Sequence, residues 1–209
     1  NSSTPSVGTV DPATGMVTGV SGGITTITYT LPTGCYATAM ITVNPLPTLY
    51  CVTGCSYCAG GAGCPVGLSG SQTGISYSLY NGITLMGGPI TGTGSPLTFG
   101  LQTVPGVYTV TAFDPSTGCR STTTCNDSVV INPNPVISGA GTTTGVHVCI
   151  GTALSLTASI TGGVWSSANP SIATVGSLSG IVSGVTVGVT TITYTLPSTG
   201  CYGTIAVTV

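Results

Sequence analysis

Short runs in which apolar residues alternate with hydroxyl-bearing residues recur along the whole chain. They include residues 25–30 (TTITYT), 107–111 (VYTVT) and 153–157 (ALSLT). Alternation with a period of two places the apolar side chains on one face of a β-strand. Thr, Val, Ile, Tyr and Gly dominate the chain, and Lys and Glu are absent. We therefore expect strands throughout and almost no helix.

Turn-forming residues separate these runs at intervals of about ten residues. Residues 11–15 and 114–118 share the pattern Asp-Pro-x-Thr-Gly, and residues 81–82 are Asn-Gly. Such spacing is typical of a sandwich of two sheets. We predict an all-β fold of tandem immunoglobulin-like antiparallel β-sandwich domains, disulfide-braced. No apolar run reaches the roughly 18 residues of a membrane-spanning helix.

An internal repeat predicts the domain organisation. Residues 25–32 (TTITYTLP) recur as residues 190–197, and Thr-Gly-Cys-Tyr follows in both copies. Asn-Pro-x-Pro, which favours an extended linker, occurs at residues 44–47 and 132–135. We therefore expect three domains: an incomplete first domain at 1–44 that is the C-terminal part of the repeat, a different disulfide-rich domain at 45–133, and a complete repeat domain at 134–209. We also expect any secretion signal to lie outside this sequence.

Nine cysteines predict a disulfide framework. Cys149 and Cys201 stand on either side of Trp165, which is the Cys…Trp…Cys order of an immunoglobulin-like core. Cys35 is the repeat equivalent of Cys201, and the six cysteines of residues 45–133 allow fifteen pairings. The pairs that we expect are Cys149–Cys201, Cys58–Cys119, Cys55–Cys64 and Cys51–Cys125.

The four clustered cysteines, Cys51, Cys55, Cys58 and Cys64, also permit a zinc or iron–sulfur site, because those metals bind thiolates. The chain has a single histidine and lacks a second Cys-x-x-Cys pair at zinc-finger spacing. Structural bridges in an oxidising compartment are the better interpretation. We expect no metal and no cofactor.

Charge is almost missing from the sequence. Arg120 is the one Lys or Arg, and Asp11, Asp114 and Asp127 are the acidic residues, so that 2% of the chain is charged where soluble domains have about a quarter. Nucleic-acid binding needs a basic surface, and a calcium site needs more carboxylates than three scattered Asp. We expect neither, and no membrane insertion.

Catalytic chemistry also lacks candidates. Asp11 and Asp114 occupy near-identical turns, where a carboxylate more often closes the turn than acts as a base. His147 has no evident acid partner, and the Gly-rich stretches near 60–74 and 87–100 lack the lysine and the context of a phosphate site. We predict that the chain is not an enzyme.

A family resemblance adds to this interpretation. Residues 164–175 (VWSSANPSIATV), 180–185 (GIVSGV) and 190–194 (TTITY) resemble bacterial Ig-like group 2 domains, the stalk modules of intimin- and invasin-type adhesins. With the motifs at 57–61 (YCAGG), 68–74 (LSGSQTG), 77–80 (YSLY) and 106–110 (GVYTV), residues 45–133 look like modules of giant secreted adhesins of Bacteroidetes, including gliding-type adhesins. The resemblance implies a non-catalytic, extracellular structural segment of a bacterial cell-surface filament or adhesin stalk. Cys149 and Cys201 depart from the usual cysteine-free members.

The expected partners follow from the same interpretation. They are copies of this chain or adjacent domains of a longer chain in a filament, and surfaces or covalently attached glycans. Ser128, in an Asp-Ser-aliphatic pattern, is the first glycosylation candidate, and Asn126 and Asn1 begin Asn-x-Ser sequons. The alternative function is a carbohydrate-binding module, because Trp165 and nine tyrosines offer rings that stack on sugars.

Overall fold

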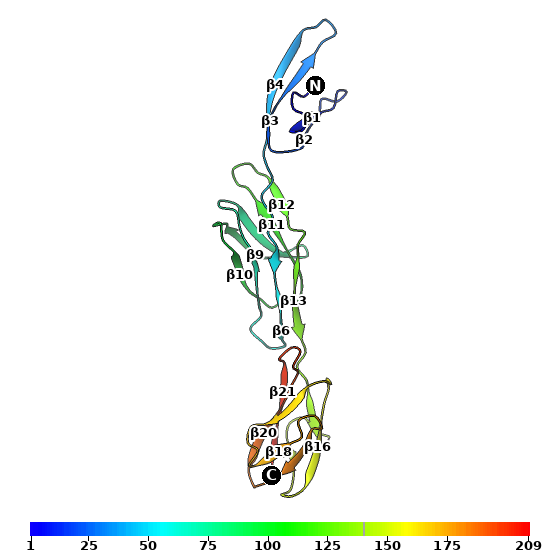
Figure 1. Ribbon diagram of the computed structural model, residues 1–209, viewed down its shortest axis with the longest axis vertical. Coiled ribbons are helices and arrows are strands. Elements are labelled where there is room, and N and C mark those ends of the chain that lie inside the picture. Colours follow the sequence, from blue (N-terminus) through cyan, green and yellow to red (C-terminus); the bar gives the residue numbers. More distant parts are fainter. Residues whose placement is uncertain (140) are drawn as a thin grey trace. The chain divides into compact units, whose positions relative to one another are not determined.

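A computed structural model describes residues 1–139 and 141–209, and every regular element in these residues is a β-strand (Figure 1). Residues 1–44 hold β1 (Gly8–Val10), β2 (Val17–Gly19), β3 (Gly23–Thr30) and β4 (Tyr36–Val43). Residues 45–133 hold β5 (Val52–Thr53), β6 (Cys55–Cys58), β7 (Cys64–Leu68), β8 (Ser76–Asn81), β9 (Thr84–Thr91), β10 (Leu97–Gln102), β11 (Gly106–Phe113), β12 (Arg120–Thr122) and β13 (Asp127–Asn132). The remaining strands are β14 (Ile137–Gly139), β15 (Val146–His147), β16 (Ala153–Ala158), β17 (Val164–Ser167), β18 (Ala173–Val175), β19 (Ile181–Gly184), β20 (Val189–Thr195) and β21 (Tyr202–Thr208).

The chain divides into two compact units. The first contains Asn1–Gly54, Pro65–Gln102 and Gly106–Ser128, and the second contains Cys55–Cys64, Thr103–Pro105 and Val129–Val209. These units differ from the three domains expected from the repeat, whose boundaries stay a prediction.

The first unit contains two antiparallel hairpins, β1–β2 and β3–β4, followed by the strands of the disulfide-rich region. In that region β11 pairs with β8 and with β12, β8 pairs with β9, and β7 lies between β5 and β10. The alternation seen in the sequence sets the core, because every second residue of β11 is buried from Tyr108 to Ala112. Those residues are buried together with Leu79, Val66 and Leu68.

The second unit is a β-sandwich. One sheet has the order β14-β16-β19-β18 and the other the order β15-β21-β20-β17. Apolar residues of both sheets form one core, with Leu156 and Val182 from the first sheet and Trp165, Ile192 and Ile205 from the second. The rings of Trp165 and Tyr194 are 4.5 Å apart, within the range in which aromatic pairs attract.

Two strand pairs are parallel, whereas the sequence pattern predicted antiparallel pairing throughout. β15 pairs with β21, and β6 pairs with β13. In both cases an early strand lies beside the last strand of its predicted domain, which period-two alternation cannot reveal. No helix in the described residues is long and apolar enough to cross a membrane.

Candidate functional site

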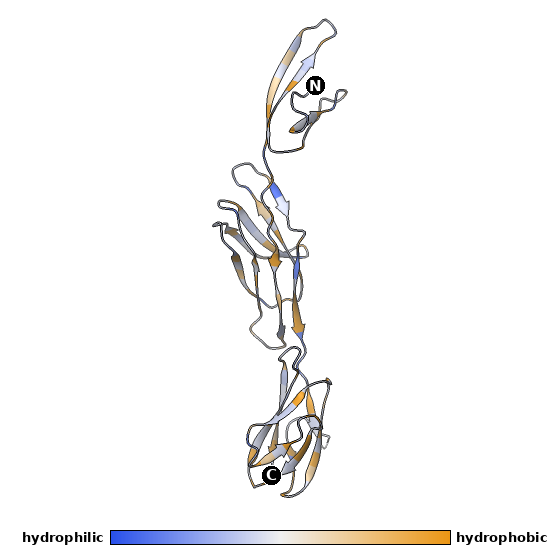
Figure 2. Ribbon diagram, viewed as in Figure 1, coloured by the Kyte–Doolittle hydropathy of each residue, from blue (hydrophilic) through white to orange (hydrophobic). Residues whose placement is uncertain are grey.

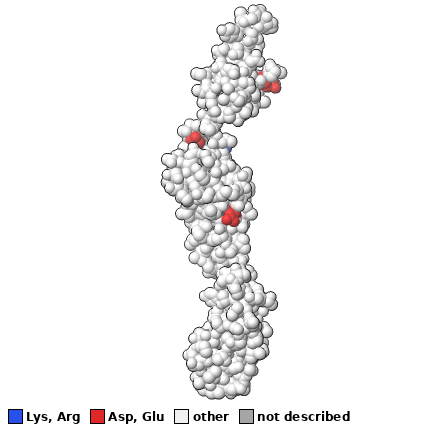
Figure 3. Space-filling model, in the orientation of Figure 1, with Lys and Arg blue, Asp and Glu red and all other residues white. Residues whose placement is uncertain are grey.

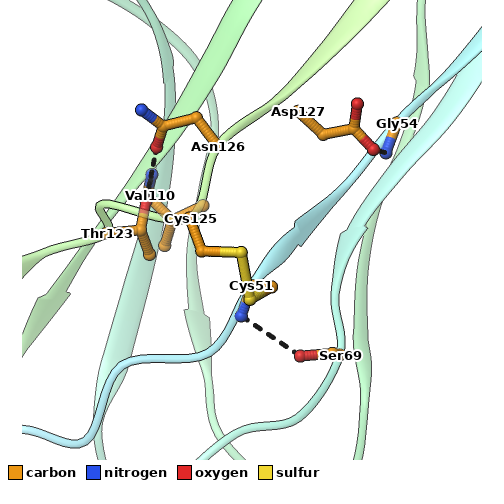
Figure 4. Close-up of a disulfide and its surroundings, with 8 residues drawn as sticks. All are labelled: Cys51, Gly54, Ser69, Val110, Thr123, Cys125, Asn126 and Asp127. Atoms are coloured by element: carbon orange, nitrogen blue, oxygen red, sulfur yellow. Dashed lines mark hydrogen bonds between the residues drawn. A yellow bond between two sulfur atoms is a disulfide. The ribbon is translucent and has the colours of Figure 1, made fainter.

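Disulfide bonds are the main chemical feature of the described residues. Cys51 bonds to Cys125 across a separation of 74 residues (Figure 4), and Cys55 bonds to Cys64. Both pairs agree with the sequence analysis. The strand pairing beside them explains the first bond, since Val52 donates its backbone N–H to the Cys125 carbonyl at 3.0 Å.

The third bond joins Cys58 to Cys201, whose Cα atoms are 5.5 Å apart. The expected pairs Cys58–Cys119 and Cys149–Cys201 are therefore wrong in this structure. Cys149 lies exposed in the turn before β16, so its side chain does not enter the core that buries Cys201. Cys201 is fully buried against the core of the second unit, and Cys58 packs on the same core.

Among the residues that the structure describes, three cysteines are free: Cys35 and Cys149 are exposed, and Cys119 is half-buried. The four clustered cysteines weighed as metal ligands, Cys51, Cys55, Cys58 and Cys64, are all in disulfides and offer no thiolate. In residues 1–139 and 141–209, no group of three or more His, Cys, Asp or Glu side chains is placed to hold a metal ion.

A shared sequence context relates Cys201 to two other cysteines and could have argued against different kinds of pairing for them. Cys35, Cys119 and Cys201 each follow Thr-Gly. Residues in the same context occupy the same place in a repeated turn, so this pattern makes Cys119 and Cys201 equivalent.

Asp11 and Asp114 each close a turn. The Asp11 carboxylate accepts hydrogen bonds from the backbone N–H of Thr14 at 2.8 Å and of Ala13 at 2.9 Å, which lower the pKa of Asp11. The Asp114 carboxylate accepts from the side chain and backbone N–H of Ser116, and these bonds lower its pKa. A carboxylate with a lowered pKa is a poor general base at neutral pH.

The other charged candidates also have structural contacts. Asp127 accepts a hydrogen bond from the Gly54 N–H at 2.8 Å (Figure 4). Arg120 lies over the Phe113 ring at 4.2 Å from its centroid. His147 is exposed on β15. The face drawn in Figure 3 carries its acidic side chains as isolated groups, so no electrostatic focus for a ligand is visible on it.

The rings proposed for sugar stacking are partly hidden. Trp165 is buried, and so are Tyr77 and Tyr108 in the disulfide-rich region. A buried ring cannot stack on a sugar. The exposed tyrosines include Tyr29, Tyr36 and Tyr202, all from the two copies of the repeat.

The glycosylation candidates lie at accessible positions. Asn1 and Asn126 are exposed, and Ser128 is half-buried at the start of β13. The Asn126 side-chain oxygen accepts a hydrogen bond from the Thr123 hydroxyl at 3.3 Å (Figure 4). No glycan role follows from these positions alone, and the three residues stay candidates.

An open apolar face is the second unusual feature. One face of the β3–β4 hairpin exposes Tyr29, at 68%, with Ala37 and Ala39, and the opposite face exposes Ile24, Tyr36 and Met40. Hydrophobic colouring runs along this hairpin in Figure 2. Exposed apolar groups of this kind mark surfaces that another segment covers.

Comparison with known proteins gives a fold and no family. No model of a protein family matches the chain, and no curated protein sequence matches it. Among solved structures, the chain is similar to invasin, a bacterial integrin-binding protein, with a TM-score of 0.53 and 16% identity over 92% of this chain and 46% of that chain.

Two further structures are similar at lower scores. A C-terminal fragment of intimin, solved with an intimin-binding domain, has a TM-score of 0.46 and 18% identity over 78% of this chain and 63% of that one. The titin fragment I67–I69 has a TM-score of 0.40 and 13% identity, over 90% and 73%. The chain thus spans only part of the length of invasin and of the intimin fragment. The likeness to invasin shows that this chain has the fold of tandem immunoglobulin-like domains.

Proposed function

We propose that this chain is a non-catalytic structural segment of an extracellular bacterial surface filament or adhesin stalk. One observation carries the proposal. The sequence TTITYTLP occurs twice, followed by Thr-Gly-Cys-Tyr directly in the first copy and after the inserted Ser198 in the second. Each copy forms a hairpin with the same strand pairing, Thr30 opposite Tyr36 and Thr195 opposite Tyr202. Repetition of one folding unit along a chain is the organisation of tandem arrays.

The chemistry of the described surface supports a structural role. The carboxylates of Asp11 and Asp114 are engaged in their own turns, and the disulfides hold residues that are far apart in sequence. Disulfides persist in oxidising, extracellular environments. A scaffold exposed to such conditions gains more from cross-links than from ion pairs.

The open face of β3 and β4 supports assembly with further modules. Immunoglobulin-like modules stabilise themselves by burying one sheet against another. Tyr29 and Ala39 lie on the face that is buried at the equivalent Tyr194 and Ile205 of the complete copy, so their exposed side chains require a covering layer. In the proposed filament, that layer comes from adjacent sequence or from a neighbouring copy of the chain.

Electron microscopy of the native material tests this proposal. Fibres that survive denaturant but are cut by protease would indicate one giant chain, and fibres that dissociate into units of about 20.3 kDa would indicate a polymer. Compact particles without fibres would contradict the proposal that the chain is part of a filament.

Glycosylation belongs to the same proposal. A surface with few charges needs another source of hydration, which glycans supply. Ser128 is the first candidate, followed by Asn126 and Asn1. Intact-mass spectrometry of native material should give a mass above that of the polypeptide, and the bare mass would refute this part.

A further inference from the structure

Five of the nine cysteines lie in two kinds of turn. Cys35, Cys119 and Cys201 each end what we name a Thr-Gly-Cys turn. In each one the cysteine carbonyl accepts a hydrogen bond from the first residue of the turn, at 2.8 to 2.9 Å. In each, the glycine before the cysteine has a positive φ between 73° and 87°, a conformation that favours glycine.

Cys58 and Cys149 each begin what we name a Cys-x-Gly turn. The Cys58 carbonyl accepts from the N–H of Gly61 at 2.9 Å, and the Cys149 carbonyl accepts from the N–H of Thr152 at 3.1 Å. The glycine at the third position has φ 80° in one turn and 75° in the other. This combination defines a type II turn in both cases.

The strand register also makes Cys58 and Cys149 equivalent. Cys58 ends β6 opposite Asn132, the last residue of β13. β15 runs parallel to β21 with His147 opposite Thr208. Two residues further along this register, Cys149 lies opposite the position that follows Val209 in the repeat. In the first copy of the repeat that position is Asn44, which begins the same Asn-Pro-x-Pro motif as Asn132.

The turns do not require their cysteines. The turn from Asp11 to Met16 and the turn from Gly176 to Ile181 have the same two backbone hydrogen bonds as the turns that end at Cys119 and Cys201. In each, the N–H of the first residue donates to the carbonyl of the last, and the N–H of the glycine donates to the carbonyl of the first. Met16 and Ile181 stand where the cysteine would be. The cysteines at the other three turns therefore need an explanation beyond turn geometry.

The Cys58–Cys201 bond supplies that explanation, because it joins one cysteine of each kind. Cys58 lies beside the end of the last strand of residues 45–133. Cys201 belongs to the following repeat, two residues before Gly203. A Cβ on Gly203 would overlap the carbonyl of Pro135, so this part of the chain lies directly against the start of that repeat. The bond thus connects the end of one predicted module to the start of the next.

We propose that this bond recurs between successive modules and that the three free cysteines are its unpaired halves. Cys149 forms this disulfide with the cysteine of a Thr-Gly-Cys turn, and Cys35 and Cys119 form it with cysteines of Cys-x-Gly turns, all in modules outside these 209 residues. The inference rests on the proposed tandem array. Each Sγ–Sγ bond forms from two thiols with loss of two protons and two electrons, and a disulfide oxidant accepts the electrons as it is reduced to two thiols.

The test extends the full chain by one module. Residues 44–132 are appended after Val209, with Cys119→Ser in the original module and Cys58→Ser in the appended one, so that Cys35, Cys149 and the appended Cys119 are the unpaired thiols. The protein is refolded in a glutathione redox buffer, its free thiols are alkylated, and it is digested with pepsin, since Arg120 leaves trypsin almost no sites. Mass spectrometry should find Cys149 bonded to the appended Cys119 in most molecules, with Cys35 alkylated.

The Cys58–Cys201 bond in the same digest is the internal control. If the Cys58–Cys201 bond is found but Cys149 is alkylated, the inference is overturned. The proposal of a filament, which electron microscopy tests, would not be affected by that result. If the Cys58–Cys201 bond is not found, the premise of the inference is wrong and the inference is overturned as well. In a matched control, Cys119 is kept in the original module and replaced by Ser in the appended one. Cys149 should then be alkylated, and a bond from Cys149 to the original Cys119 or to Cys35 would show unselective pairing and overturn the inference.

Discussion

The two copies of the repeat have the same sequence over residues 25–32 and 190–197, but they differ in burial. Tyr29 is 68% exposed, whereas the equivalent Tyr194 is 5% exposed. Tyr194 packs on Trp165, and its hydroxyl accepts a hydrogen bond from the Gly163 N–H at 2.7 Å. Asn1 aligns with Ser166, the residue after Trp165, so the given sequence of the first copy starts just beyond the position of that ring. The comparison separates what the hairpin forms by itself from what the second sheet adds.

Local contacts are the same in both copies. Thr25 and Thr190 are both buried, and each hydroxyl accepts a hydrogen bond from a backbone N–H, that of Thr4 at 3.1 Å and that of Asn169 at 3.0 Å. Strand, turn and buried threonine are thus specified within the repeat. The aromatic core depends on residues outside the repeated segment. Gly163, which donates a hydrogen bond to the Tyr194 hydroxyl, lies 31 residues before that tyrosine.

Completing the first copy should have the largest effect. Residues 134–165, with Cys149→Ser, are fused directly before Asn1, which keeps the strand register of the complete copy, so that a second layer can cover Tyr29. A complete domain of this size is stabilised by about 4 kcal/mol or more, and amide exchange in β3 and β4 should slow about a thousandfold. Hydrogen exchange measured by NMR checks this expectation. Unchanged exchange rates would show that the face is not covered by this segment.

Alanine substitutions should differ strongly between the copies. Tyr194→Ala removes a buried ring and should reduce the free energy of unfolding by about 3–5 kcal/mol. Tyr29→Ala removes an exposed ring and should change it by less than about 0.5 kcal/mol. Denaturation in guanidinium, followed by circular dichroism, measures both. Equal losses would contradict the difference in burial.

Serine substitutions should separate the bonded cysteine from the free one. Cys201→Ser opens the bond to Cys58 and should cost about 2–5 kcal/mol. Cys35→Ser leaves the described bonds intact and should leave stability unchanged in the isolated chain. Thermal unfolding without reductant is the measurement, and repeating it with reductant should abolish the difference between wild type and Cys201→Ser.

Valine substitutions should give the same result in both copies. Thr25→Val and Thr190→Val each remove an acceptor and leave a backbone N–H unpaired, at a cost of about 1 kcal/mol. Denaturant titration of each variant against wild type checks this. A loss in one copy alone would mean that the two hairpins are not equivalent at this position.

The smallest expected effect is a dependence on pH found in one copy only. Asp11 aligns with Gly176, and hydrogen bonds from Thr14 and Ala13 lower the pKa of Asp11 from its ordinary 3.8. The stabilisation is complete above the unfolded pKa and is lost as the pH falls through the lower folded value. The amide NMR shifts of Ala13 and Thr14 should therefore titrate below about pH 4, and those of Leu178 and Ser179 should not. Asp11→Asn should abolish the titration.

The sequence predicted the local structure well because alternation and turn chemistry are properties of neighbouring residues. Strands such as β3, β11 and β20 and the turns at Asp11 and Asp114 followed from such patterns. The parallel pairing of β15 with β21 and of β6 with β13 did not, because strand partners are chosen in three dimensions. The bond from Cys58 to Cys201 was missed for the same reason, since an immunoglobulin-like template suggested a bridge inside one domain.

The Cys58–Cys201 bond also determines how the chain would respond to tension. The bond closes a loop with a sequence separation of 143. A pull on the two ends passes through the sulfur atoms, so residues 59–200 bear no load while the bond is intact. At about 3.4 Å per extended residue, the hidden length is on the order of 480 Å. In a single-molecule stretching experiment this length should appear only after a reductant is added, and the oxidised segment should behave as a nearly inextensible tether.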